Sequence, residues 1–143
     1  MADSRPNFMK NWLPAILWAV AILVISTIRT PEIETPELFI GWDKLAHFFL
    51  YACFTFLVIR PLRYGPHPMP LVPVVFLSFV GASGYGIIIE VYQTLVEREM
   101  EVADALANAV GSAVVASVYL VVSLNRNRVR RKAREQRECQ RED

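Results

Sequence analysis

The chain has 143 residues, a net charge of +1 and a mean hydropathy of +0.32. Because 54% of its residues are hydrophobic, the composition argues against an ordinary soluble domain and favours a membrane protein. The small net charge hides an asymmetry, since 8 of the 15 Lys and Arg residues lie between Arg126 and Arg141. The two cysteines, Cys53 in an apolar segment and Cys139 in the charged tail, fit neither a disulfide nor a cysteine metal site.

Four apolar stretches predict four transmembrane helices, over residues 12–28, 45–59, 71–96 and 102–124. A helix needs about 20 residues to cross the hydrocarbon core, so the second stretch is short and the third is long. These lengths suit helices rather than the alternating strands, about 10 residues each, of a membrane barrel. We therefore predict an all-α integral membrane bundle of four transmembrane helices.

The first apolar segment has one feature of a signal peptide, because Arg5 and Lys10 precede it. Its apolar run is longer than the usual signal core, however, and the sequence at 26–29 is a poor cleavage site, so we predict an uncleaved anchor. Pro14 and Pro73 are expected within about the first turn of their helices, where a missing N–H costs little.

Basic and acidic loops alternate along the chain, and Lys and Arg resist translocation whereas acidic residues have little effect on orientation. The N-terminus, the second loop and the tail are basic and are predicted to be cytoplasmic; their cations include Arg5, Lys10, Arg60, Arg63 and the run from Arg126. The other two loops are acidic and are predicted to face outward; their acids are Glu32, Glu34, Glu37, Asp43, Glu97, Glu99, Glu101 and Asp104. Four spans require both termini on one side, which agrees with this assignment.

We divide the chain into a cytoplasmic N-terminus (1–11), a four-helix transmembrane domain (12–124) and a basic cytoplasmic tail (125–143). The tail is almost wholly polar and is expected to be a solvated helix or a disordered segment. Its cations either attract anionic lipid, at about 1 kcal/mol each near the surface, or anchor the topology. Four acids are interleaved with them, so we favour the anchor.

The second helix opens with polar residues, of which Asp43, His47 and Tyr51 step by four and share one helical stripe. Asp43 is also a plausible N-cap, and Lys44 a residue that snorkels to the interface. That explanation does not extend to His47, one turn further into the membrane. We interpret the stripe as part of a functional site.

Glu90 and Gln93 lie on one face near the outward end of the third helix, and Glu90 is about 9 Å inside Val96. Acids at such depth usually face the bundle interior and mark function. Ala82, Gly86 and Glu90 step by four, and small residues favour close helix contact, so Glu90 is expected to face another helix. The alternative is a neutral Glu90 that acts as a hydrogen-bonded strut.

The fourth helix begins with Asp104 and Asn108, shortly after Arg98, and a seam of small residues steps by four from Ala103 to Gly111. Asp104 alone would suit the helix dipole, but Asn108 lies deeper and needs a partner. We predict that the outward ends of the second, third and fourth helices converge in one polar cluster, to which the first helix contributes nothing. Its members are Asp43, Lys44, His47, Tyr51, Glu90, Gln93, Arg98, Asp104 and Asn108.

These residues resemble the VanZ-like family, whose pattern reads approximately D-K-x-x-H-F-x-x-Y, then E-x-x-Q, then R-x-x-x-x-x-D-x-x-x-N-x-x-G. The matching positions here are 43–51, Glu90 with Gln93, and Arg98 through Asp104 and Asn108 to Gly111. The resemblance covers about residues 12–124. Many relatives have Pro-Gly before the arginine, where this chain has Val96 and Glu97.

The resemblance implies a small polytopic protein of the bacterial cytoplasmic membrane. The family is named for low-level resistance to teicoplanin, a lipoglycopeptide, and this activity does not extend automatically to every member. We expect an envelope accessory protein whose outward cluster binds a lipid headgroup, a lipid-linked cell-wall intermediate or a lipoglycopeptide. We expect membrane lipids as partners and no nucleic acid, and the oligomeric state is left open.

Catalysis is the main alternative, with Glu90 or His47 as acid or base of an intramembrane enzyme that acts on a lipid-linked substrate. A metal site would use His47, Glu90, Asp43 and Asp104, but no tight ligand spacing supports it, and we predict neither metal nor cofactor. A proton-coupled transporter is disfavoured because four spans show no internal repeat. The sequence leaves binding and catalysis both open.

Overall fold

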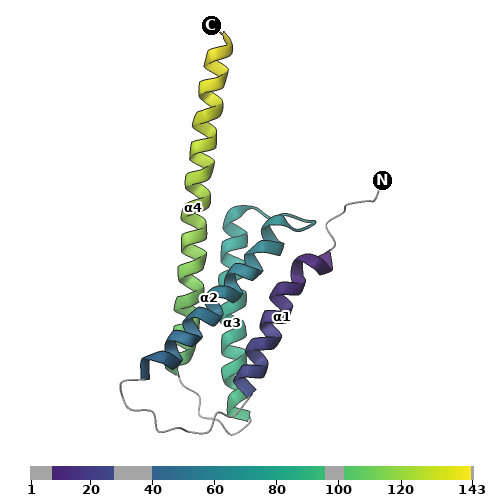
Figure 1. Ribbon diagram of the computed structural model, residues 1–143, viewed down its shortest axis with the longest axis vertical. Helices are drawn as coiled ribbons and strands as arrows, with labels where there is room; N and C mark the ends of the chain where they lie inside the picture. Colours follow the sequence, from purple (N-terminus) through teal and green to yellow (C-terminus); the bar gives the residue numbers. More distant parts are fainter. Residues whose placement is uncertain (1–7, 28–39, 96–101, 143) are drawn as a thin grey trace.

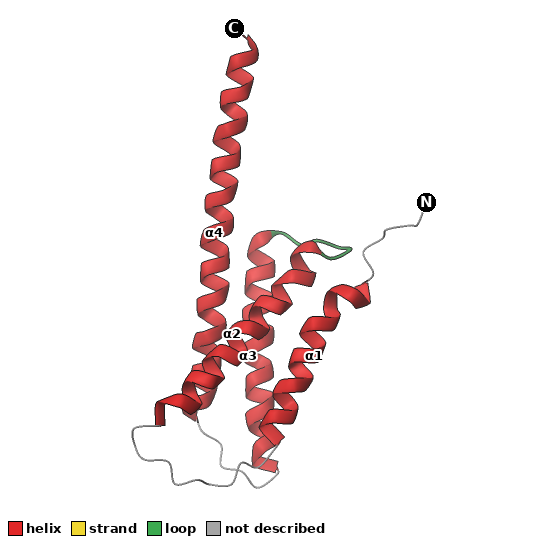
Figure 2. Ribbon diagram, viewed as in Figure 1, coloured by secondary structure: helices red, strands yellow, loops and turns green. Residues whose placement is uncertain are grey.

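The computed structural model describes residues 8–27, 40–95 and 102–142, which are helical apart from the connection between the second and third helices (Figure 2). The helices are α1 (Phe8–Thr27), α2 (Ile40–Tyr64), α3 (Leu71–Leu95) and α4 (Val102–Glu142). They run alternately up and down, so α1 begins and α4 finishes toward the same end of the molecule (Figure 1). We call this the terminal end, and the opposite end, where α2 and α4 begin, the site end. The predicted all-α fold is confirmed.

All four helices are long and apolar enough to cross a membrane. Large apolar side chains point away from the bundle on every helix; examples are Leu17, Phe56, Phe76 and Val118. A soluble bundle would bury most of these side chains, whereas lipid tails solvate them. The chain is therefore a multi-pass membrane protein in contact with lipid.

Helices α1 and α2 begin before their predicted apolar stretches. α1 begins at Phe8, so Pro14 lies inside the helix, and the prediction that it falls within about the first turn is wrong. α2 extends beyond residues 45–59 at both ends and includes Pro61 in its last turn. Hydropathy marks the part of a helix that lies in lipid, whereas the backbone hydrogen bonds continue into the polar layers. Pro73, by contrast, is the third residue of α3, as predicted.

α2 is the central helix, because it contacts α1, α3 and α4, while α1 makes no contact with α4 among the described residues. Two of the hydrogen bonds that connect α1 to its neighbours are donated by aromatic side chains. Trp18 Nε1 donates to the carbonyl of Leu50 on α2 at 3.0 Å, and Tyr85 Oη on α3 donates to the carbonyl of Ala19 at 2.7 Å. Such bonds support helix association in lipid, where hydrophobicity gives no driving force between helices.

Two glycines allow the helices to approach closely near the site end. A Cβ added to Gly111 of α4 would overlap the backbone carbonyl of Phe48 on α2. A Cβ at Gly86 of α3 would lie 3.1 Å from Tyr51 Cε1 and 3.3 Å from Asn108 Nδ2. The small-residue seams therefore lie at helix contacts at these two positions, as expected for membrane bundles.

α4 continues without a break from the apolar segment into the charged tail and extends past the other helices (Figure 1). Residues 124–140 are exposed, and Arg131 Nε lies 3.3 Å from Glu135 Oε1, four residues further along the helix. Of the two forms expected for the tail, the structure has the solvated helix.

Candidate functional site

Polar side chains from three helices meet at the site end. α2 contributes Asp43, Lys44, His47 and Tyr51, α3 contributes Glu90 and Gln93, and α4 contributes Asp104 and Asn108. The predicted convergence is therefore observed for these eight residues. The ninth member of the predicted cluster, Arg98, lies outside the described residues.

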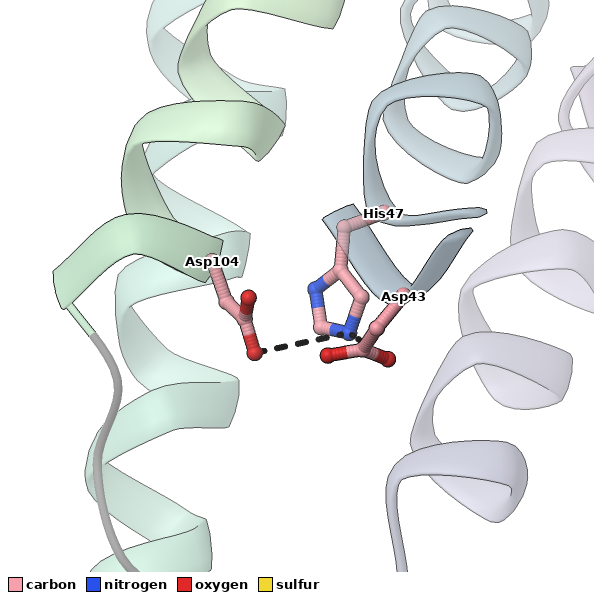
Figure 3. Close-up of side chains that lie close together, drawn as sticks. All are labelled: Asp43, His47 and Asp104. Atoms are coloured by element: carbon pink, nitrogen blue, oxygen red, sulfur yellow. Dashed lines mark ion pairs between the residues drawn. The ribbon is translucent and has the colours of Figure 1, made fainter. Parts of the chain in front are cut away.

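An ion-pair cluster forms the outer part of the site, between the first turns of α2 and α4 (Figure 3). Lys44 Nζ lies 2.8 Å from Asp104 Oδ1, a charge-assisted hydrogen bond. His47 Nε2 lies 3.8 Å from Asp43 Oδ1 on its own helix and 3.8 Å from Asp104 Oδ2 on α4. At 3.8 Å the imidazole is close enough to attract both carboxylates but too far for a hydrogen bond to either.

A small cavity of about 140 Å³ lies deeper, next to the ion-pair cluster. Its polar lining comes from all four helices: Ser26, Asp43, His47, Tyr51, Glu90, Gln93 and Asn108. Apolar side chains complete the wall, and they are Ile22, Ile25, Ala46, Leu50 and Ile89. Glu90 is only 1% exposed, so its carboxyl group faces this cavity and not lipid. That orientation agrees with the rule that intramembrane acids face the interior of a bundle.

Three polar atoms at the cavity have no hydrogen-bond partner among the described residues: Tyr51 Oη, Asn108 Oδ1 and His47 Nδ1. Tyr51 and Asn108 are each 2% exposed. A buried polar atom without a partner costs about 1–3 kcal/mol, so native proteins rarely keep one unless water, an ion or a ligand satisfies it. These three atoms are therefore available for hydrogen bonds to water or to a ligand in the cavity.

The packing of the helices explains why these side chains meet. The missing side chain of Gly111 brings α4 against the backbone of Phe48, and Asn108 and Asp104 lie about one and two turns before Gly111 on α4. Gly86 leaves room for the ring of Tyr51 and the amide of Asn108 in the centre of the bundle. These two glycines thus allow the polar side chains of α2, α3 and α4 to lie close together.

The prediction that the first helix contributes nothing to the site is wrong. Ser26 of α1 lines the cavity, and its backbone carbonyl accepts a hydrogen bond from Gln93 Nε2 at 3.3 Å. The sequence gives little sign of this role, because a serine is common in membrane helices and a backbone acceptor has no residue-type signature. Ser26 does lie four residues after the buried Ile22, so helical spacing alone would place the two on one face.

Three of the four residues considered as metal ligands lie together. One donor atom each from Asp43, His47 and Asp104 lies within 4.8 Å of the other two. The sequence showed no tight spacing because Asp104 belongs to a different helix from the other two residues. Glu90 lines the neighbouring cavity and is not part of this group within the described chain.

No protein-family model matches this chain, and comparisons with curated proteins and with solved structures found no match. The resemblance to the VanZ-like family therefore stays a prediction that depends on the residues of its three motifs.

Proposed function

We propose that this chain is an envelope accessory protein of the bacterial cytoplasmic membrane, with both termini in the cytoplasm. Its site end faces outward and binds the polar headgroup of a lipid or of a lipid-linked cell-wall intermediate. The observation that supports this most is the cavity in which buried Tyr51 and Asn108 have oxygen atoms without partners in the described chain. A headgroup with hydroxyl, amino or phosphate groups would supply the missing hydrogen bonds.

The depth of the cavity suits a headgroup. Glu90 lies five residues before the end of α3, which corresponds to about 8 Å along the helix axis. Asp43 and Asp104 lie in the first turns of α2 and α4, nearer to the membrane surface. A ligand from the outer leaflet would therefore enter from the interface and needs no passage through the bundle.

The size of the site also limits the ligand. A cavity of about 140 Å³ holds part of a headgroup and excludes a whole lipid or a whole lipoglycopeptide. An apolar groove of about 650 Å³ lies deeper on α2 and α4, lined by residues such as Ala52, Phe56, Val115 and Val118. The polar cavity and the apolar groove together favour an amphiphile, whose acyl or prenyl chain stays in contact with the helices.

The charge pattern supports the orientation. Arg63, Arg126 and Arg130 surround one pocket at the terminal end, and Lys and Arg remain preferentially on the cytoplasmic side. At the site end, acidic residues outnumber basic ones in the described part of the cluster: Asp43, Glu90 and Asp104 are acidic, and Lys44 is basic.

The test is mass spectrometry of lipids that co-purify with the protein in mild detergent. We expect the wild type to retain a headgroup class enriched over the bulk membrane, and Tyr51→Phe, which removes one partnerless hydroxyl, to lose that enrichment. Tyr92→Phe is the matched control, because Tyr92 is exposed on α3. Lipid profiles that equal the bulk membrane in all three proteins would refute the proposal.

A second function, intramembrane acid–base catalysis, is favoured by one specific observation: the His47 imidazole lies between two carboxylates beside a cavity that contains Glu90. A neighbouring carboxylate can orient an imidazole so that it acts as a general base. His47→Asn distinguishes the two functions. Loss of product formation from an added lipid-linked substrate, with unchanged lipid retention, would indicate catalysis.

A further inference from the structure

Three donor atoms lie close together at the outer part of the site. Asp43, His47 and Asp104 each place a donor within 4.8 Å of the other two, and His47 Nε2 is 3.8 Å from a carboxylate oxygen on either side (Figure 3). Two donors bound to one cation at about 2.1 Å lie no more than about 4.2 Å apart, so both 3.8 Å separations are compatible with a shared ion. They are too long for direct hydrogen bonds.

The position of Lys44 is compatible with an ion at this point. Its ammonium group contacts Oδ1 of Asp104, whereas the imidazole faces Oδ2. One oxygen of the carboxylate is thus held by a neighbouring side chain, and the other is directed toward His47. Outer contacts of this kind orient metal-binding carboxylates in known sites.

A second, independent observation points to a ligand at the same place. Tyr51 and Asn108 are each 2% exposed, have an oxygen without a partner in the described chain, and line the cavity that Asp43 and His47 also line. Tyr51 and Asn108 each lie about one turn further along their helices than His47 and Asp104. Water or a ligand group bound to a metal ion would supply the hydrogen bonds that they lack.

We propose that Asp43, His47 and Asp104 bind one divalent transition-metal ion, of the Mn²⁺ to Zn²⁺ class. One imidazole and two carboxylates form a mixed nitrogen and oxygen set, which suits these ions better than Mg²⁺ or Ca²⁺, whose sites are built from oxygen ligands. Three protein ligands leave at least one coordination position open, as in sites that bind a substrate or water rather than in closed structural sites. Access is available, since the Asp43 side chain is 59% exposed.

The ion extends the proposed function, and this part of the inference rests on it. The carboxylates of Asp43 and Asp104 would repel a phosphate or another anionic group of a lipid that approached the cavity. A divalent cation between Asp43, His47 and Asp104 reverses the local charge and offers a direct bond to an anionic oxygen. The ligand class that follows is a headgroup with a phosphate or carboxylate group, held by the metal at one side and by Tyr51 and Asn108 at the other.

The experiment uses the full-length protein in mild detergent, stripped of metal by a chelator and then titrated with MnCl₂, ZnCl₂ or MgCl₂ under equilibrium dialysis. We expect about one Mn²⁺ or Zn²⁺ per chain and weaker binding of Mg²⁺. Asp43→Asn is the deciding variant, because its exposed side chain makes it the least disruptive of the three changes, and it should weaken binding at least about tenfold. His47→Gln should do the same.

Glu135→Gln is the matched control, since it removes a carboxylate from the exposed tail helix and should leave metal binding unchanged. Thermal unfolding of each metal-free variant shows whether it folds like the wild type. The inference is overturned if the wild type takes up no more Mn²⁺ or Zn²⁺ than Asp43→Asn.

Lipid retention, measured before and after metal loading, separates the two proposals. Metal binding without any enriched lipid would support the ion site and refute the proposed headgroup function. An enriched lipid in a protein that binds no metal would support the headgroup function and refute the ion site. Retention that increases on metal loading in the wild type, but not in Asp43→Asn, is the result that supports both.

Discussion

At the site end, carboxyl groups lie between helices, with Glu90 1% exposed and Asp104 paired to Lys44. At the terminal end, Arg126 and Arg130 are exposed on α4 beside an open pocket of about 480 Å³. Exposed cations at a membrane surface remain hydrated and cost little, so they serve orientation without any special geometry. Buried acids are costly and need defined neighbours. The two ends therefore differ in physical terms: the cations at the terminal end are solvated, whereas the acids at the site end depend on their neighbours.

The largest effect should come from the helix contact on which the site end depends. Gly111→Leu places a side chain into the backbone of Phe48 and should destabilise the bundle by about 3 kcal/mol, with strongly reduced membrane abundance. Gly81→Leu is the control, because a Cβ at Gly81 meets nothing within 4 Å. Immunoblots of membrane fractions report abundance, and equal abundance of the two variants would contradict the close α2–α4 contact.

The second prediction separates the function of Glu90 from its structural role. Glu90→Gln retains shape and hydrogen-bonding capacity but removes the acid, so we expect near-normal abundance and lost activity in an envelope-stress assay on cells without the wild-type copy. Full activity at normal abundance would instead support the neutral strut. Abundance as low as that of Gly86→Leu, whose bulk would press on Tyr51 and Asn108, would indicate a structural role.

The third prediction compares an ion pair at the site end with one in the tail. A double-mutant cycle on Lys44→Gln and Asp104→Asn should give a coupling energy of about 1 kcal/mol, because Asp104 is shielded while Lys44 is partly exposed. A corresponding double-mutant cycle on Arg131 and Glu135 should give a coupling energy of about 0.3 kcal/mol or less, since both side chains are largely exposed. Reversible unfolding in mixed micelles measures both, and equal couplings would remove the contrast between the two ends.

The smallest effect is expected in the tail itself. A truncated chain that ends at Arg130 loses only exposed residues among those that the structure describes. Its free energy of unfolding should lie within about 0.5 kcal/mol of the full-length value in the same assay. A larger loss would show that the tail packs on the bundle, contrary to its exposure here.

The sequence predicted the four helices and the polar cluster because both follow from local patterns. Steps of four placed Asp43, His47 and Tyr51 on one stripe, and the cost of an acid in lipid directed Glu90 inward. Both inferences need only helix geometry and solvation, and the structure agrees with them.

Other features depend on how the helices pack, and the sequence could not supply them. The role of Ser26 involves a backbone carbonyl, and the distance of 3.8 Å between His47 and Asp104, whose convergence was predicted, depends on the contact between Gly111 and Phe48. The position of Pro14 was mistaken because hydropathy does not locate the start of a helix outside the lipid. The first two features depend on how the helices pack, and the third depends on where the helix begins outside the apolar segment.

The central claim is that the site end faces outward, and thiol labelling of intact cells tests it most directly. In a background with Cys53→Ser, one variant retains Cys139 as its only cysteine, and another has Thr35→Cys with Cys139→Ser. We predict that a membrane-impermeant thiol reagent labels position 35 and leaves Cys139 unlabelled until the cells are permeabilised. Labelling of Cys139 on intact cells, with position 35 protected, would place the polar cluster on the cytoplasmic side and contradict the proposed function.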